Sequence, residues 1–546
     1  MTGGDLLVRG LEACGVDVAF GLPGVHNLAA WKALARSDIR LVGVRHEQTA
    51  VYAADGFSRA TGRPGIAITT TGPGAANTLG ALGEAWASGS AVVVIATDIP
   101  ATLRRPGVYR GALHEATDQE AMFKPVTKHT MRVTDPASLG QAVADACAIA
   151  VAPPSRPVYL EVPTDVLSAA VEQPAQPPAA PTAYLRHGPP EKRLREAAGV
   201  IERAERPLIW AGGGALRADA REAVEELAER LSAPVMTTYM ARGLLGTRHP
   251  CAVGLPPHLP EAGRMWDEAD VVIAIGTDFD GMMTQNWAMP QPPALVAVNI
   301  DPADATKNYR ADVVLEGDAS TTTAELARLI EPRGRIQGIA KELADLRSRA
   351  RERLREEYPR EIEFLESFER AVPAEALVVA DMCIPGYWLA GFHPVPGPRR
   401  LAYPMGWGTL GYGFPLAIGS ALAGVAPVVS VAGDGGFLYA VGELATVAQE
   451  QIPVTQVIVD DGGYGMLRFD QQQAGDPTFG VDLASPDFEA LARSFGVEAE
   501  TVDGLSNDFA DALARHVGDE RPTVLVARAA LEPPPTTSPR WYRRTR

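Results

Sequence analysis

Two aspartates, each in a glycine-rich turn after an apolar run, are the residues of this sequence whose setting first suggests chemistry. Asp434 stands in Val-Ala-Gly-Asp-Gly-Gly-Phe (431–437), and Asp461 stands in Val-Ile-Val-Asp-Asp-Gly-Gly-Tyr-Gly-Met (457–466). Each run predicts a β-strand, and a right-handed βαβ crossover would place both aspartates at neighbouring strand ends. Paired carboxylates suit Mg²⁺, and glycines let backbone N–H groups approach a phosphate. For either aspartate alone, helix capping is the alternative.

This pair of turns resembles the diphosphate-binding domain of the thiamine diphosphate enzymes, which carries Gly-Asp-Gly and, further along, a pair of Asn or Asp residues. The resemblance implies that Asp434 and Asp461 bind Mg²⁺ through their side chains and Gly463 through its backbone carbonyl. Asp460 stands where asparagine is commoner in the family, which leaves its role open. The cofactor-binding residues expected in this half are Gly433, Asp434, Gly435, Gly436, Asp461, Gly463, Tyr464, Gly465 and Met466.

The same resemblance requires a glutamate in another domain, and Glu47 in Arg-His-Glu (45–47) fits it. In the family, this glutamate hydrogen-bonds the cofactor's aminopyrimidine, which then removes the thiazolium proton. Such a carboxylic acid needs an apolar surrounding and a raised pKa. On its own, Glu47 would be an ordinary acid in the first turn of a helix. The cofactor-binding residues implied for this half are Pro23, Glu47, Thr71, Gly74 and Asn77.

The segment Gly-Trp-Gly-Thr-Leu-Gly-Tyr-Gly-Phe-Pro (406–415) resembles the part of the family that holds the cofactor bent. The resemblance places Leu410 beneath the V-shaped cofactor and makes Gly408 a backbone acceptor. Taken alone, Leu410 would be a core leucine. A further glycine run after a predicted strand, at 211–215, would let a dinucleotide approach, but FAD is not expected because a lone glycine run is weak evidence.

Residues 111–119 bear on the reaction, because acetohydroxyacid synthases carry Phe-Gln-Glu there and this chain does not. Residues 464–471 also lack the Gln-Trp-Glu of those synthases. The sequence is more similar to a subgroup that decarboxylates polar 2-oxo acids, for example a guanidino-oxopentanoate decarboxylase. Besides Glu47, the catalytic candidates are His26, His114 and Glu115, which would protonate the enamine or bind the distal end of the substrate. Either histidine could instead be a buried structural residue.

The expected activity is therefore decarboxylation of a small 2-oxo acid through an enamine/carbanion intermediate. An acetolactate synthase-like carboligase, which joins that intermediate to a second carbonyl compound, is the alternative. A cofactor-binding relative without turnover is a remote third, against which the intact Glu47, Asp434 and Asp461 argue. An NAD-dependent oxidoreductase is disfavoured because neither terminal domain opens with Gly-x-Gly-x-x-Gly.

Alternating apolar runs and helical patterns predict an α/β protein of three consecutive domains with parallel sheets. A sheet's carboxyl edge is where such turns bind ligands. We expect the following organisation: a pyrimidine-binding domain (1–170), a proline-rich linker (171–191), a Rossmann-like central domain (192–337), a charged, solvated helical connector (338–371), a diphosphate-binding domain (372–530) and an aperiodic tail (531–546).

Composition narrows the possible partners. Of the 546 residues, 50 are Lys or Arg and 67 are Asp or Glu, so the net charge of −17 disfavours nucleic acid and anionic membranes. Four cysteines without paired spacing, and a start with neither a basic segment nor an apolar signal core, predict a cytoplasmic protein. The family builds each active site from two subunits, which implies a homodimer as the minimum and a homotetramer as a further arrangement.

Overall fold

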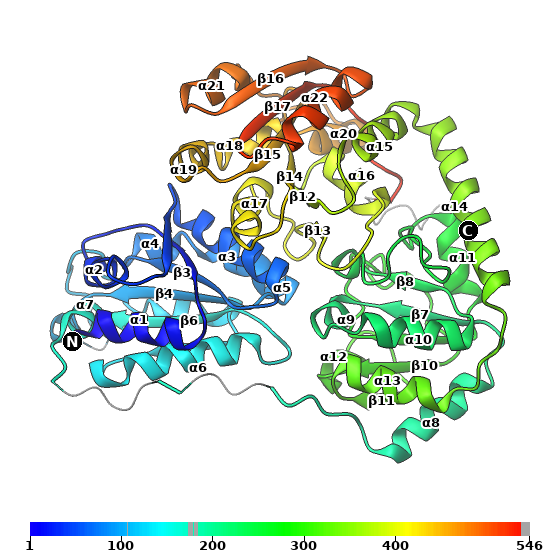
Figure 1. Ribbon diagram of the computed structural model, residues 1–546, viewed down its shortest axis with the longest axis horizontal. Coiled ribbons are helices and arrows are strands. Elements are labelled where there is room, and N and C mark those ends of the chain that lie inside the picture. The colour runs from blue at the N-terminus through cyan, green and yellow to red at the C-terminus, as the bar shows by residue number, and fades with distance from the viewer. Residues whose placement is uncertain (106, 173–177, 180–183, 537–546) are drawn as a thin grey trace.

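Three parallel β-sheets with helices on both faces form the chain in the computed structural model, which describes residues 1–105, 107–172, 178–179 and 184–536. In Figure 1 the first domain (blue to cyan) and the central domain (green) lie side by side, and the third (yellow to red) lies above both. The predicted fold class is confirmed. Parts of the predicted linker (173–177, 180–183) and of the tail (537–546) lie outside the described residues. No helix of the described residues is long and apolar enough to cross a bilayer.

The first domain has strand order β2-β1-β3-β4-β6-β5. Its strands are β1 (Val18–Gly21), β2 (Arg40–Gly43), β3 (Gly65–Thr69), β4 (Val92–Asp98), β5 (His129–Arg132) and β6 (Val158–Pro163). Its α-helices are α1 (Gly3–Ala13), α2 (Leu28–Leu34), α3 (Glu47–Thr61), α4 (Pro73–Ala76), α5 (Leu79–Ser88), α6 (Leu139–Val151) and α7 (Thr164–Ser168). Both faces of the sheet are buried: Val93 and Ile95 pack with α1 and α6, whereas Val92 and Val94 pack with α3 and α5.

The third domain repeats this order as β13-β12-β14-β15-β17-β16. Its strands are β12 (Leu377–Ala380), β13 (Leu401–Ala402), β14 (Val428–Gly433), β15 (Val454–Asp460), β16 (Glu498–Asp503) and β17 (Thr523–Arg528). Its α-helices are α16 (Ile384–Phe392), α17 (Gly413–Leu422), α18 (Asp434–Leu438), α19 (Leu444–Glu450), α20 (Gly465–Ala474), α21 (Phe488–Ser494) and α22 (Asn507–Val517).

The central domain has a five-stranded sheet of order β11-β10-β9-β7-β8. Its strands are β7 (Pro207–Ala211), β8 (Val235–Thr237), β9 (Val271–Ile275), β10 (Leu295–Asn299) and β11 (Val313–Glu316). Its α-helices are α8 (Glu191–Glu202), α9 (Gly213–Arg217), α10 (Arg221–Leu231), α11 (Pro260–Glu268), α12 (Pro302–Thr306) and α13 (Ala319–Leu329).

The connector between the central and third domains differs from the expected solvated helix. It is two helices, α14 (Ile336–Glu357) and α15 (Pro359–Ala371), because Pro359 cannot donate the hydrogen bond that would continue α14. Each helix also buries an apolar face, Leu343 and Leu354 in α14 and Phe364 and Phe368 in α15. The connector is charged and helical, but it is not wholly solvated, because each helix buries one face and α15 buries Glu361 as well (4% exposed).

Helix α3 of the first domain packs directly against α17 of the third domain (Figure 1). A Cβ atom on Gly56 would collide with the carbonyl oxygen of Leu416, and one on Gly419 would collide with that of Ala53. The Glu443 carboxylate also accepts hydrogen bonds from the backbone N–H groups of Arg45 (3.0 Å) and His46 (3.1 Å). These contacts fix the start of α3, where Glu47 lies, against the third domain.

Candidate active site

The two predicted metal-binding aspartates follow neighbouring strands. Strands β14 and β15 pair in parallel with Gly433 opposite Val459, so Asp434 and the 460–463 loop leave the same edge of the sheet. Asp434 begins α18 and is 1% exposed. Ser485 Oγ lies 3.0 Å from Asp434 Oδ2 and 3.0 Å from Asp460 Oδ1. Asp460 also accepts a hydrogen bond from Gly462 N–H (3.2 Å), so its carboxylate is engaged in shaping the turn.

One oxygen of each predicted ligand lacks a partner. Asp434 Oδ1 and Asp461 Oδ1 are buried and accept no hydrogen bond from any described residue. Burial, together with the negative charge of Asp434, raises the pKa of Asp461 to about 6. Burial also raises the pKa of Asp434. A divalent cation would neutralise both carboxylates, so the residues present fit Mg²⁺.

The predicted metal set contains only two acidic side chains. In the described part of the chain, no three or more His, Cys, Asp or Glu side chains form a group that could bind a metal ion. The third predicted ligand, the Gly463 carbonyl, lies in a turn with φ of +76° at Gly462 and +155° at Gly463. A Cβ atom on Gly463 would collide with the carbonyl oxygen of Val481, and one on Gly465 would collide with Asp461 Oδ2. Gly463 therefore requires glycine, whereas a side chain at 465 would displace the Asp461 carboxylate.

Arg468, which the sequence analysis did not single out, holds this turn from α20. Its guanidinium donates to the backbone carbonyls of Asp461 (3.3 Å) and Gly462 (3.1 Å) and to Asp482 Oδ1 (2.9 Å). The residue stands one helical turn after the glycines, a position at which an arginine donor to the turn could have been anticipated.

The turn that carries Gly408 and Leu410 rests on a second residue that sequence reasoning missed. Asp381 directly follows β12, is 1% exposed, and accepts hydrogen bonds from Met382 N–H (2.7 Å) and Gly411 N–H (3.1 Å). Burial raises its pKa to about 6. Leu410 is half-buried and belongs to none of the hydrophobic core clusters, so the core-leucine interpretation is wrong. An acid immediately after a predicted strand was the available signal for Asp381.

The first domain brings several of its predicted residues together. Glu47 is the first residue of α3 and is 7% exposed, and its Oε2 accepts a hydrogen bond from Asn77 Nδ2 (3.0 Å). A Cβ atom on Gly74 would lie 3.2 Å from Glu47 Oε1. Thr71 Oγ1 lies 2.9 Å from Thr97 Oγ1 inside the domain. Pro23 is exposed, on the turn that ends β1.

His26 and His114, from two different loops, face each other. Their rings lie 5.2 Å apart between centroids at an interplanar angle of 72°, and the Nδ1 atom of each is buried without a hydrogen bond to any described residue. Burial and the neighbouring His114 ring lower the pKa of His26, so this imidazole is uncharged near neutral pH. A Cβ atom on Gly72 would lie 2.5 Å from the His114 carbonyl oxygen, which places this loop against the Gly72 turn.

Glu115 points into its own loop rather than toward the histidines. One carboxylate oxygen accepts hydrogen bonds from Arg110 N–H (3.0 Å) and Ala112 N–H (2.9 Å), and these backbone donors lower its pKa. The geometry therefore gives Glu115 a part in shaping the loop that carries His114.

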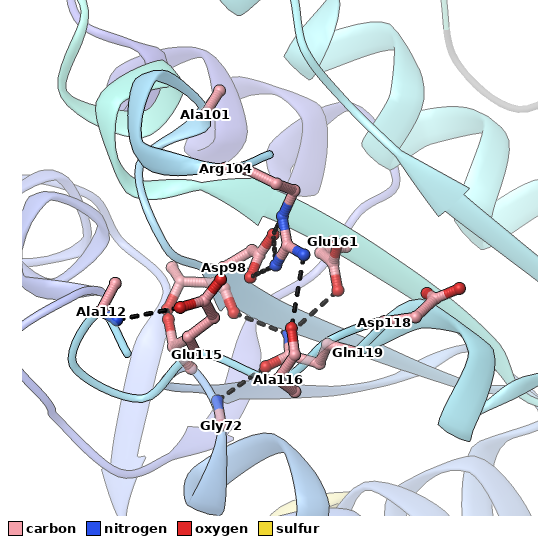
Figure 2. A network of polar contacts seen from close by, with 12 residues as sticks. Gly72, Asp98, Ala101, Arg104, Ala112, Glu115, Ala116, Asp118, Gln119 and Glu161 are labelled. Carbon is pink, nitrogen blue, oxygen red and sulfur yellow. Dashed lines mark hydrogen bonds and ion pairs between the residues drawn. The ribbon is translucent and has the colours of Figure 1, made fainter. Parts of the chain in front are cut away.

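A buried polar network, absent from the sequence analysis, anchors that loop (Figure 2). Gln119 Oε1 accepts from Gly72 N–H (2.7 Å), and its Nε2 lies within hydrogen-bonding distance of Tyr159 Oη (2.8 Å) and Glu161 Oε2 (3.0 Å). Asp98 pairs with Arg104 (2.6 Å) on the same network. Burial and the negative charge of Asp98 raise the pKa of Glu161 to about 7.

The two halves of the predicted site, one at Glu47 and one at Asp434 and Asp461, lie on different domains of the chain. Neither Glu47 nor Asn77 makes a hydrogen bond to the turns at 433–436 or 460–466 among the described residues. The first and third domains do meet through polar contacts: besides the Glu443 contacts at the start of α3, Gly406 N–H (3.1 Å) and Trp407 N–H (2.8 Å) donate to the Glu84 carboxylate.

The glycine run of the central domain opens α9 after β7. Gly213 and Gly214 line a cavity of about 750 Å³ together with Trp86 of the first domain and Trp407 of the third. This space is of the size that small-molecule sites occupy.

The repeated sheet order and a carboxylate pair at one edge define an α/β protein with two related terminal domains, one of which has a sheet edge suited to a cation. Three family models of the thiamine pyrophosphate enzymes match the chain. They are the N-terminal TPP binding domain (residues 1–122), the central domain (194–326) and the C-terminal TPP binding domain (382–527). The chain belongs to the thiamine pyrophosphate enzyme family, as the sequence analysis predicted.

Similar proteins include a decarboxylase and acetolactate synthases. A probable 2-ketoarginine decarboxylase, AruI, of Pseudomonas aeruginosa is 36% identical over 518 residues, which cover 93% of this chain and 91% of that protein. A probable acetolactate synthase large subunit of Methanocaldococcus jannaschii is 32% identical over 531 residues, covering 92% and 88%. The acetolactate synthase large subunit of Parasynechococcus marenigrum is 35% identical over 542 residues, covering 94% and 86%.

Proposed function

We propose that this protein is a thiamine diphosphate- and Mg²⁺-dependent enzyme that decarboxylates a polar 2-oxo acid. The observation that carries the proposal is the His26–His114 pair, held by its loop against the Gly72 turn of the cofactor-binding half. The buried Nδ1 atom of each ring has no hydrogen bond to any described residue, so the pair is suited to relaying a proton to the intermediate, which ends a decarboxylation as an aldehyde. The similarity to a 2-ketoarginine decarboxylase supports the same reaction.

The cofactor is accommodated by residues of both terminal domains. Asp434, Asp461 and the Gly463 carbonyl would hold Mg²⁺ against the diphosphate, and Gly433, Gly435 and Gly436 would leave room for it. When bound, thiamine diphosphate supplies the carbon that adds to the 2-oxo group and accepts the electron pair left as CO₂ departs. Glu47 would hold a proton at Oε1 toward the aminopyrimidine, because Asn77 already occupies its Oε2.

A homodimer is the assembly that we propose as the working unit, with a pair of dimers as a further arrangement. Membership of the family, in which each active site takes its first and third domains from different subunits, supports this assembly. We expect the protein in the cytoplasm. Its four cysteines are free, although α1 and α6 bring Cys14 into hydrogen-bonding contact with Cys147. FAD remains unexpected.

Carboligation is the second candidate, favoured by the similarity to acetolactate synthases. The deciding experiment incubates the holoprotein with Mg²⁺ and single 2-oxo acids, trapping CO₂ and identifying the organic product. We expect CO₂ and an aldehyde in equal amounts. An acetohydroxy acid as the main product would establish the carboligase instead, and no CO₂ from any 2-oxo acid would support a cofactor-binding relative without turnover.

A further inference from the structure

A cavity of about 340 Å³ lies between the central and third domains, beside the expected cofactor site. Gly408 and Met466, both expected to contact the cofactor, line it. Tyr239 and Gln285 line it from the central domain. Its volume is that of a small-molecule site. All of its lining residues come from one chain.

Asp470 is the one charged side chain among the described residues that line this cavity. It lies on α20, is half-buried, and makes no hydrogen bond or ion pair with any described residue. Arg468 on the same helix is already engaged by Asp482 and by the carbonyls of the metal turn. His258 lies within 3.1 Å of the Met283 carbonyl oxygen, and burial lowers its pKa, which keeps it uncharged near neutral pH. Among the described residues, none compensates the negative charge of Asp470 in this cavity.

The rest of the wall is suited to a flat cation. Tyr387, Tyr403 and Trp407 present aromatic rings, and Met382, Met405 and Met466 present thioethers. Aromatic faces attract guanidinium and ammonium groups, and guanidinium additionally pairs with a carboxylate through two parallel hydrogen bonds. A partly desolvated carboxylate is stabilised by a cationic partner, and the described residues supply none at Asp470.

We propose that Asp470 selects the substrate by pairing with a cationic group, guanidinium or ammonium, at the distal end of the 2-oxo acid. This inference rests on the proposed decarboxylation and adds to it the charge of the substrate and the residue that recognises it. A neutral acid of the same length would leave Asp470 unpaired, and an anionic one would meet repulsion.

The test compares kcat/KM for CO₂ release from 5-guanidino-2-oxopentanoate and from 2-oxooctanoate, an acid of the same chain length whose distal end is neutral. The parent should prefer the guanidino acid, and Asp470→Asn should reduce that preference by about 10- to 100-fold, the range of a charge-assisted hydrogen bond. Asp470→Arg should abolish the preference and improve 2-oxoadipate relative to the guanidino acid. Asp476→Asn removes an exposed carboxylate just beyond the same helix and should leave both values as in the parent.

Each outcome bears on one of the two proposals. A parent that releases no CO₂ from any 2-oxo acid refutes the proposed function itself. A parent that decarboxylates the neutral acid as well as the guanidino acid, or an Asp470→Asn variant with the parental preference, refutes only the role of Asp470. A fall in thiamine diphosphate affinity with an unchanged preference would also overturn it, because Asp470 would then serve the cofactor.

Discussion

The first and third domains share one strand order, but different chemical groups follow the strands at the carboxyl edges of their sheets. In the third domain, burial raises the pKa of the Asp434 and Asp461 carboxyl groups, and each has an oxygen that no described residue hydrogen-bonds. In the first domain, Glu47 is already hydrogen-bonded by Asn77, and the His26 imidazole is uncharged near neutral pH. The shared topology selects where a ligand binds, whereas the residues that follow each strand decide whether that edge holds a cation or moves a proton.

The two edges are also held in place differently. The third domain relies on glycines that admit close contacts and on backbone carbonyls fixed by Arg468. The first domain relies on buried polar side chains, with Gln119 bonded to Gly72 and Asp98 paired with Arg104. We therefore expect substitutions at the third edge to remove the cofactor and those at the first edge to alter proton transfer or its pH dependence.

The largest expected effect is at the cation edge. Asp434→Ala should abolish activity and weaken the joint binding of Mg²⁺ and thiamine diphosphate by at least about 100-fold, because one of two ligand carboxylates is lost. Titration calorimetry measures this affinity. Asp503→Ala, at another strand end of the same sheet, removes an exposed acid and serves as the control. Parental cofactor affinity in Asp434→Ala would refute the metal assignment.

The second prediction concerns Glu47, whose substitution should leave cofactor binding nearly intact, unlike that of Asp434. Glu47→Gln keeps the hydrogen bond to Asn77 but cannot supply a proton to the aminopyrimidine. Deuterium exchange of the thiazolium proton, followed by NMR, should slow by about 10²- to 10⁴-fold, and turnover should fall with it. Glu191→Gln, an exposed acid that likewise begins a helix, should exchange at the parental rate. Parental exchange in Glu47→Gln would reduce Glu47 to a helix-start acid.

A smaller effect is expected at the histidine pair. His114→Ala should lower decarboxylation by about 10- to 100-fold, or divert product toward an acetohydroxy acid, while thiamine diphosphate affinity stays within a factor of two or so. Steady-state kinetics and product analysis on the true substrate give the answer. His129→Ala, in an exposed position on β5, is the control. If His26→Ala and His114→Ala both retain parental kinetics, the pair is structural.

The smallest effect concerns stability in the first domain's network. Because burial raises the pKa of Glu161 from 4.5 to about 7, the folded chain binds more protons than the unfolded chain between these values. Stability should therefore decline as pH rises through that window. Glu161→Gln removes this decline, so the midpoint of thermal unfolding of the variant should gain about 2 °C or more on the parent between pH 5 and 8. A pH-independent difference between the two would mean that Arg132, whose guanidinium lies 3.2 Å from Glu161 Oε1, fully compensates the charge.

Prediction from sequence succeeded where structure is local. Asp434 and Asp461 immediately follow β14 and β15, and Glu47 begins the helix after β2; strand ends in a parallel α/β sheet gather at one edge whatever the details of packing. The glycines of the metal turn follow from the same local geometry, since positive φ angles at Gly462 and Gly463 demand them. The connector was misjudged because composition reports how many charges a helix has, and only their arrangement around the folded chain reveals the buried face.

What the sequence by itself determined is the family, the three-domain α/β fold and the acids that end its strands, because these depend on residues adjacent in the chain. The tertiary structure alone decided the rest. Gln119 meets Gly72 and Glu161 across separations of 47 and 42 residues, and Asp381 meets Gly411 across 30. Asp470 acquires a cavity only because the central domain closes one side of it. Burial and unpaired charge are properties of the surroundings, which arise when distant segments pack together.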